Sequence, residues 1–125
     1  MNAQQGTKHD TGKLPWGLFP FDAAEQIVKV LQFGAQKYAA RNWEKGLTNS
    51  RTWEAAQRHL IAWHRGETLD AETGLSHLAH AACEILFALA FEVRGRTDLD
   101  DRPGYGREEL TGERAPLQTA APRAP

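Results

Sequence analysis

Apolar residues recur at spacings of three and four residues in three separate segments, which is the pattern of amphipathic helices. The first segment covers residues 22–40, and its apolar face is formed by Ile27, Val28, Leu31, Ala35 and Tyr38. The second covers residues 51–65 and the third residues 74–94, and the glycines that follow them, Gly66 and Gly95, are typical of helix C-termini. The apolar face of the third segment consists of Leu75, Leu78, Ala82, Ile85, Leu86, Leu89 and Val93. Because no stretch alternates between apolar and polar residues as a strand does, the pattern predicts an all-α helical bundle.

Polar residues near the beginning of two of these helices are candidates for N-terminal caps. Asp22 followed by Glu25 resembles a capping box at the start of the first helix. Asp70 or Thr73 could cap the third helix, and the negative charge of Glu72 would favour its positive end.

The segments outside the helices differ from them in composition. Residues 1–20 end in the sequence LPWGLFP, whose two prolines exclude a continuous helix and favour an extended arm. Residues 96–125 contain four of the six prolines and one aromatic residue, which predicts a mostly disordered tail with room for one short docked piece. We therefore divide the chain into an arm (1–20), a helical domain (21–95) and a tail (96–125). Three such helices leave apolar surface uncovered, so we expect a fourth short helix or a second copy of the chain to complete the bundle.

Composition excludes several functional classes. The formal net charge of the 125 residues is −1 at pH 7, so no strong overall field would attract nucleic acid or a membrane surface. No run of 18 apolar residues occurs, and the first ten residues contain no hydrophobic signal region. The single cysteine, Cys83, rules out an intrachain disulfide and fits a reducing compartment. We therefore expect a cytoplasmic protein that has neither a nucleic acid nor a membrane as its partner.

Carboxylates and imidazoles gather around the connection between the second and third helices. His77 and His80 lie one turn apart on one side of the third helix, beside its apolar face. Antiparallel packing of the second and first helices would bring six further polar residues to the same end, namely His59, Glu67, Asp70, Glu72, Asp22 and Glu25. Carboxylate oxygens and imidazole nitrogens are common ligands of divalent ions, so this set predicts a divalent metal site.

Each part of this set also has a simpler interpretation. Asp22 and Glu25 can serve as helix caps, and a histidine near a core is commonly a hydrogen-bonded part of the scaffold. Arg51, Arg58 and Arg65 recur every seven residues on the second helix and form either a solvated basic face or a phosphate-binding surface. Spacing alone leaves these alternatives open.

Two long stretches carry a resemblance to a known family. FGAQKYAARNWEKG at residues 33–46 and RHLIAWHRGETLDAETGLSHLAHAACEILFAL at residues 58–89 are similar to the phage branch of the MazG-like nucleotide pyrophosphohydrolases, often labelled dATP/dGTP diphosphohydrolase. The resemblance extends over residues 8–94 and includes HDTGKLPW in the arm. It implies an all-α catalytic domain that acts as a homodimer or homotetramer in the host cytoplasm. The implied reaction is attack of water on a purine (deoxy)nucleoside triphosphate, which gives the monophosphate and pyrophosphate with Mg²⁺ or Mn²⁺ as cofactor.

Within this branch, the sequence also resembles members that convert dGTP to dGMP in phages whose genomes contain 2-aminoadenine. It departs from the wider superfamily in its expected metal ligands, which that superfamily presents as E-x-x-E on one helix and E-x-x-D on a later one. Here the later position reads His77-Leu-Ala-His80, and His59 stands where a carboxylate is expected. Imidazole ligands would favour Mn²⁺ over Mg²⁺ more than an all-oxygen site does.

The polar residues and the resemblance together give an expected metal centre. We expect two or more divalent ions, with the candidate ligands Glu67, Asp70, His77 and His80, followed by Glu25 and His59. Glu67 or Glu72 would accept the proton of the attacking water.

The nucleotide would be held by residues of the arm and the first two helices. The candidates for contact with phosphate oxygens are Lys13, Lys37, Arg41 and Arg58. The base would stack on Trp43 or Tyr38, with Asn42 at its edge, unless Trp43 and Asn42 only anchor a loop. Two other functions stay open, namely a triphosphohydrolase that releases inorganic triphosphate, and a non-catalytic helical adaptor that binds a structural ion.

Overall fold

The computed structural model describes residues 4–105 of the chain, and within them the regular structure is helical. Three α-helices are present, namely α1 (Phe21–Lys37), α2 (Asn49–His64) and α3 (His77–Val93). Three short 3-10 turns accompany them, at Trp16–Leu18, Asn42–Lys45 and Thr97–Leu99. In this part of the chain β pairing is limited to one isolated bridge, between Leu69 and Ser76. The predicted all-α class is therefore confirmed.

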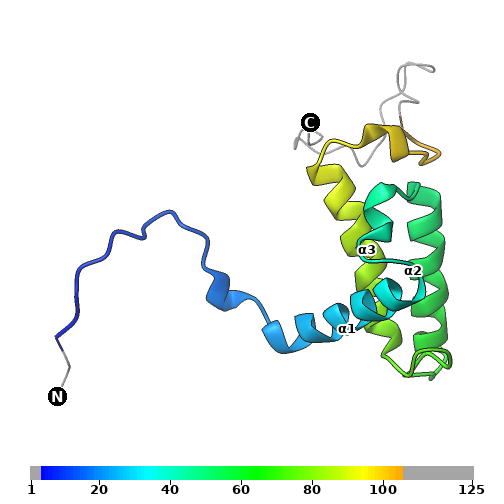
Figure 1. The fold of residues 1–125 in the computed structure, drawn as a ribbon, viewed down its shortest axis with the longest axis horizontal. Coiled ribbons are helices and arrows are strands. Elements are labelled where there is room, and N and C mark those ends of the chain that lie inside the picture. The colour runs from blue at the N-terminus through cyan, green and yellow to red at the C-terminus, as the bar shows by residue number, and fades with distance from the viewer. Residues whose placement is uncertain (1–3, 106–125) are drawn as a thin grey trace.

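α3 is the central helix of the body. α2 and α3 lie side by side as an antiparallel pair, and α1 lies across α3 (Figure 1). The core between α1 and α3 contains Val30, Ala79 and Cys83, with four partly buried residues around them, namely Ile27, Leu31, Leu75 and Phe87. Small side chains at the centre let the helix backbones approach closely. Burial also raises the pKa of the Cys83 thiol to about 12, so the thiol stays protonated and unreactive.

The predicted glycine ends of α2 and α3 are confirmed. Gly66 has φ 104° and Gly95 has φ 70°, which are left-handed conformations that glycine adopts without steric cost. At the end of α2, the amide of Gly66 donates to the carbonyl of Trp63, and the amide of Glu67 donates to that of Ala62. These two bonds satisfy carbonyls that the last turn of the helix leaves without a partner.

The predicted N-terminal caps of α1 and α3 are wrong, and so is the predicted start of α3. α1 begins after Pro20, and the Asp22 carboxylate accepts only from the neighbouring amide of Ala23, so no capping box forms. α3 begins at His77 rather than at residue 74, and its cap is Ser76, whose hydroxyl accepts from the amide of Leu78. The later start has a local cause, because hydrogen bonds within the loop hold residues 70–75 in a turn.

The predicted core face of α3 is also wrong. Its large members lie exposed in the single chain, namely Leu78, Ile85, Leu86, Leu89 and Val93. The buried positions are instead His77, Ala79, Ala81, Cys83 and Phe91. α3 is apolar around most of its circumference, so periodicity could not distinguish the face that contacts α1 and α2 from the face left open. The exposed face is available to a second copy of the chain, and that assembly stays a prediction.

The two ends of the described chain behave differently. Residues 4–20 run away from the helices as an arm that contains the turn Trp16–Leu18 (Figure 1). Residues 96–105, which we assigned to the tail, pack against the helices, because the Asp101 carboxylate accepts from the amide and hydroxyl of Ser50. The rest of the predicted tail, residues 106–125, lies outside the described residues. Among the helices that are described, none is long and apolar enough to span a membrane.

Candidate metal centre

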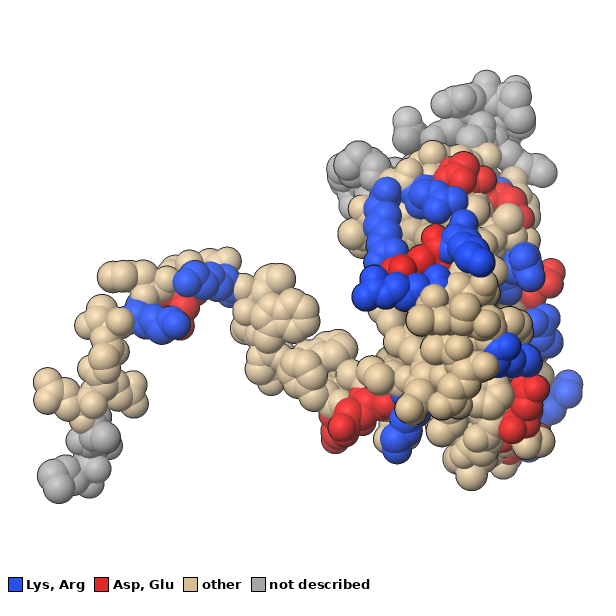
Figure 2. Space-filling view, viewed as in Figure 1, with Lys and Arg blue, Asp and Glu red and all other residues tan. Residues whose placement is uncertain are grey.

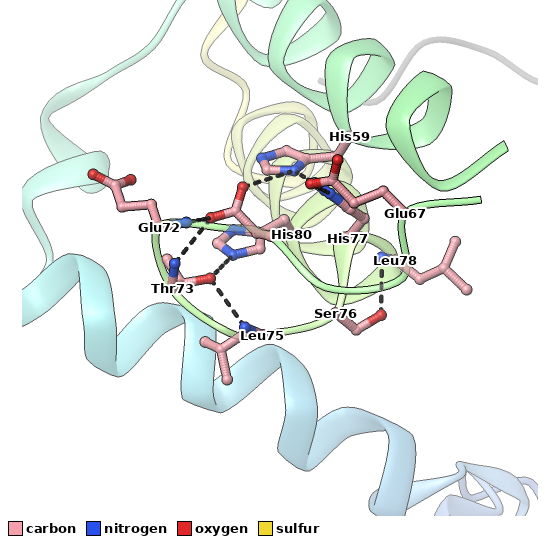
Figure 3. A network of polar contacts seen from close by, with 10 residues as sticks. His59, Glu67, Glu72, Thr73, Leu75, Ser76, His77, Leu78 and His80 are labelled. Carbon is pink, nitrogen blue, oxygen red and sulfur yellow. Dashed lines mark hydrogen bonds and ion pairs between the residues drawn. The ribbon is translucent and has the colours of Figure 1, made fainter. Parts of the chain in front are cut away.

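The loop between α2 and α3 folds back and brings polar side chains from three elements together (Figure 3). His59 comes from α2, Asp70 from the loop, and His77 is the first residue of α3. The fold of the loop is fixed by its backbone, since the amide of His77 donates to the carbonyl of Thr68 and the amide of Asp70 donates to that of Leu75. This path of the loop brings Asp70 beside the first turn of α3.

The ligand atoms of His59, Asp70 and His77 all lie within 4.8 Å of one another. The Nδ1 atoms of the two imidazoles are 2.9 Å apart, and Oδ1 of Asp70 is 4.0 Å from Nδ1 of His59. Nitrogen and oxygen ligands bind a divalent ion at about 2.0–2.2 Å, so two ligands at right angles are about 3 Å apart. The three side chains therefore fit one divalent ion after small movements.

The hydrogen-bond partners of His77 determine which of its nitrogens faces the group. Nε2 of His77 lies 2.9 Å from Oε1 of Glu67, and an ionised carboxylate can only accept, so Nε2 carries the proton. Nδ1 of His77 then presents its lone pair toward the group, 2.9 Å from Nδ1 of His59. Glu67 contacts the outer nitrogen of His77, on the side away from the three ligand atoms.

The two oxygens of Asp70 have different partners. Oδ2 accepts from the backbone amides of Glu72 and Thr73, which leaves Oδ1 directed at His59. Partial burial acts to raise the pKa of Asp70, but the hydrogen bonds from Thr73 and Glu72 and the nearby His80 outweigh it and hold the pKa below its usual value. Asp70 therefore stays ionised, as a metal ligand must be.

His80 packs beside the three-residue group rather than joining it. Its ring stacks on that of His59 with the centroids 4.5 Å apart, and its Nε2 lies 2.7 Å from the hydroxyl of Thr73. Burial lowers the pKa values of His59 and His80, and the neighbouring imidazoles act in the same direction. Neutral imidazole is the form that binds a metal ion. Thr73 was expected only as a possible cap, and no spacing in the sequence indicates its contact with His80, because that contact depends on the path of the loop.

The remaining acidic candidates lie farther from the group. Glu72 forms an ion pair with Lys37 at 3.3 Å, and its side chain extends away from the imidazoles (Figure 3). This pair joins the C-terminal end of α1 to the loop. Asp22 and Glu25 lie near the N-terminal end of α1, so the expectation that they reach the metal group of the same chain is wrong. Glu25 precedes Lys37 by twelve residues, which is about 18 Å along a helix. The cause is that α1 crosses α3 instead of lying antiparallel to α2.

The candidates for nucleotide binding are spread over the body. Trp43 stacks on Phe87 of α3 with ring centroids 4.6 Å apart, and the guanidinium of Arg94 lies 5.3 Å from its ring. These contacts favour the alternative in which Trp43 anchors its loop. Asn42 shares that loop and is partly buried, whereas Tyr38 is exposed.

The basic candidates differ in their distance from the metal group. Lys37 contacts the loop of the metal centre, Lys13 lies in the arm, and Arg58 precedes His59 on α2. Figure 2 shows Lys and Arg side chains gathered around acidic groups on the upper part of the body. Among the described cations, Arg41 and Arg94 both pair with Glu44. Arg94 follows α3, and His77 begins it, so about 25 Å of helix separates these cations from the metal group.

Comparisons with known proteins agree on one family. Residues 3–102 match the family described as dATP/dGTP diphosphohydrolase, N-terminal. A relative named dATP/dGTP diphosphohydrolase, from Salmonella phage PMBT28, is 38% identical over 97 residues, which are 78% of this chain and 33% of the relative. The chain thus spans about a third of the length of this relative. No solved structure matches the chain.

Proposed function

The chain belongs to the dATP/dGTP diphosphohydrolase N-terminal family, and from this premise we propose that it hydrolyses a purine deoxynucleoside triphosphate to the monophosphate and pyrophosphate. The observation that carries the proposal is the convergence of His59, Asp70 and His77 on one point. The name of the phage relative supports the class of reaction and the purine bases. dGTP is the expected preferred substrate, with dATP and GTP as weaker ones, and no nucleic acid or membrane takes part.

His59, Asp70 and His77 would hold a divalent ion. Three protein ligands leave coordination positions open to a triphosphate, as catalytic sites do and closed structural sites do not. When bound, the ion supplies Lewis-acid stabilisation of the charge that develops on the phosphoryl oxygens. The two imidazoles favour Mn²⁺ over Mg²⁺. The part of the chain that is described offers one such three-residue group, so the further ions that we expected would need oxygens of the triphosphate or ligands from another copy.

Glu67 is better suited to position His77 than to bind the ion. Its carboxylate accepts from Nε2 of His77 and so turns Nδ1 of the same ring toward the metal group. Carboxylates that hold a ligating histidine in this way commonly strengthen metal binding 10- to 100-fold. Glu72 then remains as the candidate acceptor of the proton of the attacking water. It would become available when Lys37 leaves its ion pair with Glu72 and binds a phosphate oxygen of the nucleotide.

Lys37 and Tyr38 are the residues best placed to receive the nucleotide. Lys37 already lies beside the loop, so its ammonium group can hold the β and γ phosphates as the leaving group. Attack at the α-phosphorus requires the β and γ phosphates to be fixed in place, because the water must approach in line with the oxygen that leaves with them. Tyr38 follows directly and is 66% exposed, with the ammonium group of Lys37 at 5.4 Å from its ring, so it is a candidate to stack on a purine base, with Asn42 as a candidate for the edge of the base.

Phosphorus NMR of the products tests the reaction. With Mn²⁺ and dGTP we expect dGMP and pyrophosphate, and the rate should fall at least about 100-fold in Asp70→Asn and in His77→Ala, since each removes a ligand. His64→Ala, which removes an exposed histidine of α2 outside the group, is the matched control and should retain activity. Inorganic triphosphate among the products would establish the triphosphohydrolase instead. Metal binding without turnover of any deoxynucleotide would establish the structural-ion adaptor.

A metal titration separates the role of Glu67 from that of the ligands. Glu67→Gln should lower Mn²⁺ affinity about 10- to 100-fold while activity at saturating Mn²⁺ returns close to the unaltered value. Asp70→Asn should not be rescued in this way. An equal loss of activity at saturating metal in both variants would show that Glu67 acts on the substrate itself.

A further inference from the structure

The N-terminal arm carries large apolar side chains that its own helices do not cover. Leu14, Trp16 and Leu18 are 75%, 66% and 83% exposed, and Phe19 and Phe21 are 48% and 57% exposed. The segment is locally ordered, because the amides of Leu18 and Phe19 donate to the carbonyls of Pro15 and Trp16. A contiguous exposed apolar segment of this kind marks a surface that binds another molecule.

The arm begins at the end of α1 that projects past α3, and it runs away from α2 and α3 (Figure 1). It therefore presents its apolar side chains to the surroundings of the chain rather than to its own core. On the N-terminal side of this apolar stretch lie Lys8 and Lys13, with Asp10 between them, so the outer part of the arm carries a small net positive charge.

A cleft of about 890 Å³ lies between α2 and α3. Its apolar lining includes Trp53, Leu60, Ile85, Leu89 and Phe91. Of these, Trp53, Ile85 and Leu89 are about half exposed or more, so residues 4–105 of the single chain leave the cleft unfilled. Besides the partly buried Glu84, the charged residues of the lining are four carboxylates and two arginines, which makes the rim acidic.

We propose that this cleft binds the N-terminal arm of a second copy of the chain. The apolar side chains of the arm match the apolar lining, and Lys8 and Lys13 match the acidic rim. Every copy has one arm and one cleft, so a two-fold pair that exchanges arms fills both clefts with a closed symmetry.

The area involved suits a stable pair. A buried aromatic residue covers roughly 150–250 Å², and Trp16, Phe19 and Phe21 are about half to two thirds exposed, so on two arms they newly bury on the order of 500–900 Å². Stable interfaces bury about 1,200–2,000 Å² in total, and the remaining apolar residues of the arms add to the sum.

The C-terminal residues of the same chain are a poorer match to the cleft. Residues 106–125 follow Tyr105, which lines the cleft, but their only large apolar residues are Leu110 and Leu117. A segment of this composition cannot replace the water over so large an apolar lining. The arm together with the first residue of α1 carries three aromatic residues and two leucines within eight positions, from residue 14 to residue 21.

Disulfide trapping between two different variants tests the exchange. Chains with Leu18→Cys are mixed with chains carrying Leu89→Cys under mild oxidation, and the native Cys83 is buried and does not compete. We expect a linked pair that contains one chain of each kind, identified by peptide mass. The control partner is Gln32→Cys, an exposed position of α1 outside the cleft, which should not link to the arm. Equal linking of Leu18→Cys to Leu89→Cys and to Gln32→Cys overturns the proposal. So does a double variant with Leu18→Cys and Leu89→Cys in one chain that forms only the disulfide within that chain.

The mass of the assembly gives a second, independent result. The full-length double variant Trp16→Ser, Leu18→Ser removes two exposed side chains and should leave the helical body folded, while the constant for dissociation into single chains rises at least about 100-fold. Val28→Ser, a 59% exposed apolar residue of α1 outside the arm, is the matched control and should retain the pair. A single-chain mass for the unaltered protein, or an undiminished pair in the arm variant, overturns the proposal.

Discussion

Glu84 is a single side chain whose surroundings affect the pH dependence of folding. It lies on α3 in the lining of the cleft, and burial raises its pKa to about 7 although Arg58 and Arg51 act to lower it. The folded state therefore holds a proton on Glu84 that the unfolded state has already lost between about pH 4.5 and pH 7. Its contribution to stability is fully present below pH 4.5 and is lost as the pH rises through 7.

Replacing the carboxyl group of Glu84 should remove this loss of stability at high pH. At pH 5, Glu84→Gln should melt at about the same temperature as the unaltered protein. At pH 8 it should melt several degrees higher, which corresponds to a gain in folding free energy on the order of 2 kcal/mol. Calorimetry at the two pH values measures it. Glu54→Gln removes an exposed carboxyl group of α2 and should not change the pH dependence. A uniform shift of Glu84→Gln at both pH values would mean that the carboxyl group is not protonated in the fold.

At the same scale, the residue types of the candidate metal group could be predicted, but their roles could not. His77 and Asp70 follow from helical spacing and from the acidic turn, since both lie near one helix end in any antiparallel pair. The side of each ring that faces the group depends on hydrogen bonds made across the loop. The contact between Glu67 and Nε2 of His77 is such a bond, and it is the reason why we propose Glu67 as a positioning residue instead of the expected ligand.

The elements show which local signals are reliable. The ends of α2 and α3 could be predicted because a glycine in a left-handed conformation is sufficient to stop a helix. The start of α3 could not, because it depends on backbone bonds between residues 70 and 75 that compete with the helix. The buried face of α3 could not either, since a helix that is apolar all round gives no periodic signal.

The cap of α3 links the stability of an element to the metal group. Ser76→Ala removes the oxygen that accepts from the amide of Leu78, which should cost about 0.5–2 kcal/mol of folding free energy. It should also weaken Mn²⁺ binding, because His77 is the first residue of the helix. Chemical denaturation and a metal titration measure the two effects. Ser76→Asn keeps an accepting oxygen and should restore both, and a failure to do so would point to a different role of the serine.

At the scale of the whole molecule, the amino-acid composition predicted that the folded body ends at residue 95, which is too early. Residues 96–105 read as part of a Pro- and Gly-rich tail, yet Leu99 packs beside Gly46, and Asp101 binds Ser50. Few residues make these contacts, and they are far apart in the sequence, so neither periodicity nor composition signals them.

Two truncations should therefore differ. A chain that stops after Tyr105 should keep its melting temperature, whereas one that stops after Arg96 should stay helical but melt several degrees lower, because it loses the Leu99 contact and the Asp101 bonds. Circular dichroism on heating distinguishes them. Identical melting curves would mean that residues 97–105 rest on the helices without stabilising them.

The projecting arm also affects how large the molecule appears in solution. A compact chain of 125 residues has a radius of gyration of about 14 Å, whereas residues 4–15 of the arm, which contain a turn at Asp10–Lys13, would span up to about 40 Å when fully extended. A sizing column separates by hydrodynamic volume, so a single chain with its arm outstretched would travel ahead of a compact standard of equal mass and imitate a pair. Two chains with their arms folded away would travel behind the position that their doubled mass suggests. Elution volume would then give nearly the same value for both, and only an absolute mass from light scattering tells them apart.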